Sequence, residues 1–129
     1  MPARGGSWQG SKWCWPVTRL AVYLRDGLAC VWCGWAVEDG AGLTLDHLTP
    51  HCRGGSNESR NLVTACKRCN DTRGATSAAE WARRHGKDVR AVRRHARRAL
   101  GRWRRLARAY LSERATVAAY LAQIREGKA

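Results

Sequence analysis

An aspartate and a histidine stand side by side at positions 46 and 47, directly after the strand-like run Leu43 to Leu45. Phosphodiester hydrolysis needs a base that works near neutral pH and a hard divalent cation held by oxygen ligands. His47 has the chemistry of such a base, and Asp46 and Asn70 can supply the oxygens, Asn70 through its amide carbonyl. Because neighbours in a strand point to opposite faces, we expect a bulge or twist that brings Asp46 and His47 to one site. Taken alone, the dipeptide is more typical of an ordinary turn at the end of a strand.

Four of the six cysteines form two Cys-x-x-Cys pairs, Cys30 with Cys33 and Cys66 with Cys69. Two such pairs in a short chain predict a tetrahedral Zn²⁺ site. Four thiolates leave no open position for a substrate water, so the predicted zinc is structural. The remaining cysteines, Cys14 and Cys52, are predicted to be free thiols. We see no signal peptide or membrane-spanning stretch, and metal-bound thiolates fit a reducing compartment, so we expect a cytoplasmic protein without membrane contact.

A strand, a loop, a second strand and a helix must position these side chains. The first strand is predicted from Leu43, the polar loop over residues 50–59, the second strand over 61–65, and the helix from Cys66 onward. Before them, a helix with Pro16 in its first turn is predicted to stop at Asp26-Gly27. After them, a short helix is predicted to begin at Thr76 or Ser77 and to end at Gly86. The predicted fold class is α+β.

The C-terminal third is strongly basic. Residues 83–108 contain twelve Lys or Arg and one acidic residue, and the whole chain carries a formal charge of +14 with a pI of about 10.8. Such a surplus of uncompensated charge favours a nucleic-acid partner, although basic runs are usually solvated helix faces. We predict phosphate contacts by Arg90, Arg94, Arg97, Arg98 and Arg105.

An apolar heptad pattern runs from Val89 to Ile124 and is broken at Glu113. It predicts a long helical extension. Gly101 and the Ser112-Glu113 step are candidate bends, so one helix and two helices both fit the pattern. We expect the apolar stripe to pack within the chain, and a helix-mediated dimer is the alternative to a monomer.

The stretch DHLTPHCRGGSNESRNLVTACKRCNDTRG resembles the core of HNH endonucleases, which have a ββα-metal fold and often a four-cysteine zinc knuckle. The preceding LRDGLACVWCG is similar to the lead-in of such proteins, especially small ones from phages. The resemblance covers Leu20 to Gly74. It implies a general base at His47, a metal ligand at Asp46 and a loop-holding asparagine at Asn61.

The final histidine of the family is replaced here by Asn70. The resemblance therefore implies an HNN variant that uses Mg²⁺ or Mn²⁺ rather than a transition metal that prefers imidazole. Arg73 stands where the family often has Lys, and we expect it to contact phosphate. His51 is expected to be a solvated loop histidine.

These observations predict three segments: a flexible basic arm at residues 1–12, an HNH nuclease core at 13–80 and a basic helical extension at 81–129. The predicted function is a metal-dependent DNA endonuclease or nickase that leaves 5′-phosphate and 3′-hydroxyl ends. A phage setting with a terminase in genome packaging is favoured over homing and restriction. The alternatives are a non-catalytic zinc-knuckle DNA-binding protein on a degenerate HNH scaffold and an RNA-binding basic-helix protein. The presence of Asp46, His47, Asn61 and Asn70 together favours an enzyme.

Overall fold

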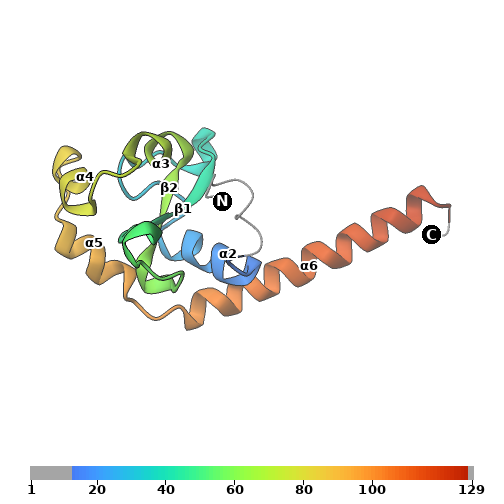
Figure 1. Ribbon diagram of the computed structural model, residues 1–129. Coiled ribbons are helices and arrows are strands. Elements are labelled where there is room, and N and C mark those ends of the chain that lie inside the picture. The colour runs from blue at the N-terminus through green and yellow to red at the C-terminus, as the bar shows by residue number, and fades with distance from the viewer. Residues whose placement is uncertain (1–12, 128–129) are drawn as a thin grey trace.

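A computed structural model describes residues 13–127, so the predicted arm at residues 1–12 lies outside the described part of the chain. Five helices and one two-stranded sheet make up its main elements, with short 3₁₀ turns in the loops between them. Figure 1 shows α2 to α5 gathered around the hairpin, while the far end of α6 extends away from them. The elements are α2 (Pro16–Arg25), β1 (Leu43–His47), β2 (Leu62–Cys66), α3 (Lys67–Arg73), α4 (Ala78–Arg84), α5 (Val89–Ala96) and α6 (Gly101–Arg125). The α+β fold class is confirmed.

The hairpin is antiparallel and regular. Its register runs without interruption from Leu43 opposite Cys66 to His47 opposite Leu62. Of the bulge or twist expected at Asp46-His47, the bulge is therefore absent. Because the alternation of the strand is kept, Asp46 faces α3, whereas His47 lies on the face toward α2.

Both faces of β2 are covered, and every residue of this strand is buried. One apolar cluster joins Trp32, Val63 and Trp81 to Ala96 of α5. A second cluster fills the space between the hairpin, α2 and the start of α6. Its buried members include Val22, Leu45, Leu62, Leu100 and Ala107. The C-terminal extension thus supplies part of both cores.

The long basic pattern forms two helices. Asp88 caps α5 by accepting a hydrogen bond from Arg90 N–H, and the chain leaves the helix at residues 97–100, next to the candidate bend Gly101. The Ser112-Glu113 step lies inside α6. The apolar stripe packs within the chain only as far as Trp103, near the start of α6. From Leu106 onward the stripe is about half exposed, at Leu106, Tyr110, Val117, Tyr120 and Ile124.

Ser77 is the N-cap of α4, one of the two residues predicted for that position. Proline occupies the first turn of α2, as expected. Among the described residues, no helix combines the length and the apolar character that crossing a membrane requires.

Candidate active site and zinc centre

A cavity of about 680 Å³ opens along the β1 strand and the adjoining face of α3. Its walls come from β1, α3, the start of α2 and the loop after β1. The predicted site residues Asp46, His47, Asn70 and Arg73 all line it, and so do Trp13, Arg19, His51 and Lys67. The structure therefore brings Asp46, His47, Asn70 and Arg73 to one cavity without a bulge, whereas Asn61 does not line it.

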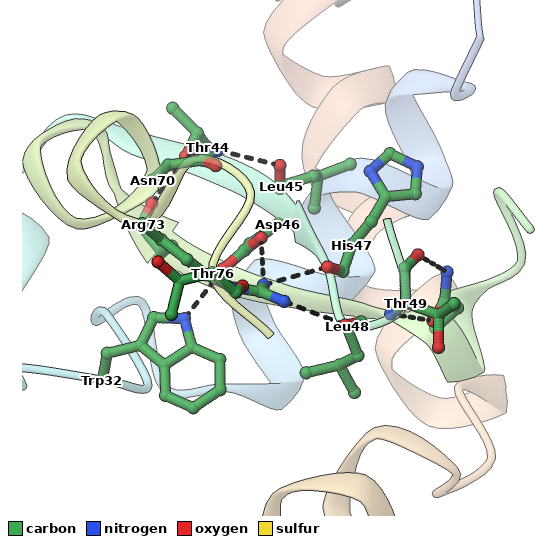
Figure 2. A network of polar contacts seen from close by, with 12 residues as sticks. Trp32, Thr44, Leu45, Asp46, His47, Leu48, Thr49, Asn70, Arg73 and Thr76 are labelled. Carbon is green, nitrogen blue, oxygen red and sulfur yellow. Dashed lines mark hydrogen bonds and ion pairs between the residues drawn. The ribbon is translucent and has the colours of Figure 1, made fainter. Parts of the chain in front are cut away.

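Asp46 is 5% exposed, and both of its carboxylate oxygens have partners inside the protein (Figure 2). Arg73 Nη1 donates to Oδ1 at 2.6 Å, and the indole Nε1 of Trp32 donates to Oδ2 at 2.9 Å. A carboxylate oxygen can accept two hydrogen bonds, so each oxygen keeps one position for a further ligand. These contacts fix the carboxylate in one orientation at the wall of the cavity.

Asn70 is oriented by two acceptors on β1. Its Nδ2 donates to the Thr44 hydroxyl at 2.9 Å and to the Leu45 carbonyl at 3.1 Å, as Figure 2 shows. A carbonyl can only accept, so the nitrogen must face Leu45 and the carbonyl oxygen Oδ1 must face away from it. Asp46 and Asn70 thus offer oxygen atoms on the same side of the hairpin. This donor set fits a hard cation such as Mg²⁺ or Mn²⁺, which takes oxygen ligands and keeps several waters.

His47 is held by Asn57, a residue of the loop between the strands. The Nε2 atom of His47 lies 2.8 Å from the amide oxygen Oδ1 of Asn57. That oxygen is an acceptor, so Nε2 carries the proton and Nδ1 keeps its lone pair in the neutral ring. Burial lowers the pKa of His47, and the hydrogen bond with Asn57 and the charge of Asp46 oppose that shift. A neutral ring with a free Nδ1 is the form that accepts a proton.

Aromatic side chains surround the ring of His47. The ring of Trp13 lies 4.9 Å from it, and the ring of His51 lies 6.3 Å away, roughly edge-on. Arg19 places its guanidinium 5.6 Å from the Trp13 ring. Asn57 is not among the residues predicted to belong to the site. In a loop made of polar residues, no sequence signal distinguishes Asn57 from its neighbours.

Asn61 ties the two ends of the loop that follows β1. Its Oδ1 accepts from Thr49 N–H at 2.9 Å, and its Nδ2 donates to the carbonyls of Thr49 and Ser56 at 3.1 and 2.8 Å. All three bonds fall on residues of the segment that also carries Asn57. Asn61 therefore acts on His47 only through the loop.

Arg73 is 2% exposed, and its guanidinium is used inside the protein. Besides Asp46, it donates to the carbonyls of His47, Leu48 and Thr76 at 2.9, 2.9 and 3.0 Å. The phosphate contact predicted for it stays a prediction, and these four partners give the side chain a structural task. The other predicted arginines are exposed, and none of them lines this cavity. They lie on α5, on α6 and, for Arg97 and Arg98, just after α5.

The four cysteines of the two pairs converge as predicted. Their sulfur atoms all lie within 4.8 Å of one another, and the sulfurs of Cys33 and Cys66 are 3.8 Å apart. Four sulfurs bound to one Zn²⁺ at about 2.3 Å in a tetrahedron are about 3.8 Å apart, so the residues fit this ion. Backbone N–H groups of Cys33 and Cys69 point at the sulfurs of Cys30 and Cys66, which adds donors to the thiolates.

The cysteines of the cluster differ in the direction of their pKa shifts. Burial raises the pKa of Cys30, and burial together with the neighbouring sulfurs raises that of Cys69. At Cys33 burial also acts upward, but hydrogen bonds from Trp35 N–H and the nearby thiols outweigh it and bring the pKa to about 7. Four thiolates at this distance need a cation among them. Cys14 is buried and Cys52 is exposed, and both lie outside the cluster.

Residues 30–76 match the family model described as HNH endonuclease. The chain is 38% identical over 71 residues to the CRISPR-associated endonuclease Cas9 of Actinomyces naeslundii, and 35% identical over 66 residues to the protein of the same name from Corynebacterium diphtheriae. These segments cover 54% and 50% of this chain but only 6% of each of those proteins.

Proposed function

Residues 30–76 belong to the HNH endonuclease family, and from this premise we propose that the protein is a metal-dependent DNA endonuclease or nickase. The observation that carries the proposal is one cavity in which His47, with its Nε2 bonded to Asn57, lies beside the oxygen ligands Asp46 and Asn70. A base and a pair of hard oxygen ligands are the two requirements of phosphodiester hydrolysis.

His47 is the general base of the proposed reaction. Asn57 holds the proton of the ring on Nε2, so Nδ1 removes a proton from the attacking water. Attack on phosphorus then breaks the bond to the 3′ oxygen, which takes a proton from solvent, and leaves 5′-phosphate and 3′-hydroxyl ends. Asn61 keeps the loop in place, and the loop keeps the ring in this orientation.

Asp46 and Asn70 are the proposed ligands of a catalytic Mg²⁺ or Mn²⁺, separate from the structural zinc of the four cysteines. When bound, the ion offsets the negative charge that builds on the phosphate and on the leaving oxygen. The role of Asn70 depends on the bonds to Thr44 and Leu45 that turn its carbonyl oxygen away from the strand.

DNA is the proposed substrate, and the exposed arginines of α5, of the turn that follows it and of α6 are its proposed backbone contacts: Arg90, Arg94, Arg97, Arg98 and Arg105. Phosphate contacts of this kind position a duplex without reading its sequence. We further propose a cytoplasmic, phage-encoded protein that acts with a terminase in packaging; co-purification with the large terminase subunit tests this setting. The half-exposed stripe of α6 keeps a helix-mediated dimer as the alternative to a monomer.

Plasmid cleavage with Mg²⁺ or Mn²⁺ tests the activity. His47→Ala should reduce the rate by about 10²–10⁴-fold, the usual contribution of a general base, while zinc content and DNA affinity stay near wild type. His51→Ala is the matched control, because it removes an exposed imidazole from the same cavity and should keep most of the activity. Equal cleavage by His47→Ala and wild type would end the proposal. Binding without cleavage by wild type would favour the zinc-knuckle DNA-binding alternative, and tighter binding to duplex RNA would favour the RNA-binding one.

A further inference from the structure

A second cavity, of about 390 Å³, lies between the loop after β1 and helix α5. It is distinct from the cavity of Asp46 and His47, and no predicted catalytic residue except Asn61 lines it. Its walls carry three arginines and one acid: Arg60, Arg93, Arg97 and Glu58. A concave site with two surplus positive charges concentrates positive potential and attracts an anion.

A buried ion pair connects the two walls of this cavity. Arg25 and Asp26 are bonded at 2.7 Å, and their side chains are 1% and 0% exposed. Arg25 Nη1 donates to Ala96 O at the end of α5 and to Ser59 O in the loop, at 2.9 and 3.3 Å. The carboxylate of Asp26 is also 2.7 Å from Nε2 of His95 on α5. The spacing between loop and helix is therefore fixed before any ligand binds.

The loop wall is made largely of backbone. Gly54 has a φ of +82°, and a Cβ on Gly55 would lie 1.8 Å from the Thr49 carbonyl oxygen, so the chain can fold this tightly only with glycine there. The side chain of Asn61 pins the same turn to Thr49 and Ser56. This rigidity favours binding, because the loop loses little conformational entropy when a ligand binds.

The arginines of the helix wall have no side-chain partner in the part of the chain that the structure describes. Among residues 13–127, neither Arg93 nor Arg97 has a hydrogen bond or ion pair from its guanidinium, although Arg93 is half-buried. A partly buried charge without a counter-charge is unfavourable until an anion arrives. Arg60 pairs with Glu58, and the two side chains are 67% and 63% exposed, so Arg60 can turn to a ligand at little cost.

We infer that this second cavity binds one backbone phosphate of the DNA, held jointly by Arg93 and Arg97 with Arg60 at the rim. The inference rests on the proposed function, which makes DNA the ligand. Arginine suits this role because its planar, multi-donor guanidinium matches the oxygens of a phosphate. The loop that forms the phosphate site also carries Asn57, so the same loop would contact the bound DNA strand and the base His47.

The test measures binding, without cleavage, by fluorescence anisotropy of a labelled DNA duplex of about 20 base pairs in 50–200 mM salt without added Mg²⁺ or Mn²⁺. The variants are Arg93→Gln, Arg97→Gln and the double variant. The control is Arg90→Gln/Arg94→Gln, a pair with the same i, i+4 spacing on α5 that lies outside the cavity.

For one shared phosphate, the double variant should lower the slope of log affinity against log salt by about 0.9, and its loss of affinity should differ from the product of the single losses. The control pair should show multiplicative losses. A slope change of about 1.8 with multiplicative losses would mean two separate phosphates, and no change would mean no site; either result overturns the inference. Lack of cleavage by wild type, with this binding pattern intact, would count against the nuclease proposal alone.

Discussion

Arg73→Met separates a structural role of this buried arginine from the phosphate contact predicted for it. The substitution keeps much of the side chain's length but removes every donor. It leaves the Asp46 carboxylate without its ion-pair partner and deprives the carbonyls of His47, Leu48 and Thr76 of a hydrogen bond. All four acceptors lie around the end of β1, the strand that carries the candidate base.

The expected loss is large because both members of the pair are buried, at 2% and 6% side-chain exposure. Breaking a buried ion pair by removing one partner costs about 3–5 kcal/mol. The whole free energy of unfolding of a domain is about 5–15 kcal/mol. At roughly 4 °C per kcal/mol for a chain of this size, Tm should fall by about 12–20 °C. Arg73→Lys should lie between, since an ammonium keeps the charge beside Asp46 but cannot reach all four acceptors.

Thermal unfolding followed by circular dichroism, at a fixed zinc concentration, is the assay. Arg68→Met is the matched control, because Arg68 is an exposed arginine of the same helix whose guanidinium lies 5.1 Å from the ring of Trp35. It should cost about 0.5–1 kcal/mol at most. In an Asp46→Asn background, Arg73→Met should cost less than in wild type, because no buried charge is then left unpaired. A Tm for Arg73→Met within 2–3 °C of that of the Arg68→Met control, together with weaker DNA binding, would refute the structural role.

Two further outcomes follow from the packing of the chain. Cys66→Ser should abolish zinc binding and unfold residues 28–74, because a hairpin of two strands is only marginally stable by itself. Metal analysis and Tm measure this effect. Cys52→Ser is the control: Cys52 is exposed and lies outside the cluster, so zinc content and Tm should stay unchanged. Deleting residues 110–127 should shift Tm by only a few degrees, since most of these side chains are exposed. A fall in molar mass by light scattering, beyond that of the deleted residues, would identify them as a dimer interface.

The sequence predicted those parts of the molecule that depend on local pattern. Two Cys-x-x-Cys pairs predict a four-sulfur cluster because each turn brings its own two sulfurs together, and only one further contact has to form. The hairpin and α2 follow from short apolar runs with turn residues and a proline at their ends. The expected bulge failed because it rested on the assumption that Asp46 and His47 must share a face of the strand, whereas the cavity extends past the strand and reaches both.

The contacts that could not be predicted pair residues far apart in the chain. Arg25 donates to a carbonyl 71 residues away, and nothing in the pattern of α5 indicates a buried guanidinium below its last turn. In the sequence, Arg73 cannot be told from the other arginines. In the structure, α3 directs its side chain inward, where it pairs with Oδ1 of Asp46 while Trp32 donates to Oδ2. In a sequence with this many arginines, residue type alone does not separate a buried arginine from an exposed one, since only tertiary packing decides which of them meets a carboxylate.

Three different devices hold this hairpin, and each acts on a different part of it. The cysteine cluster includes Cys66, the last residue of β2, and Arg73 binds the carbonyls at the end of β1. The Arg25–Asp26 pair binds the carbonyl of Leu62 and the N–H of Thr64, at the outer edge of β2. A two-stranded sheet cannot be rigid without such support, and a base must be held to a fraction of an ångström to be useful. Since Arg25 reaches α5 as well, the basic extension is part of the framework that positions His47 and is not an independent appendage.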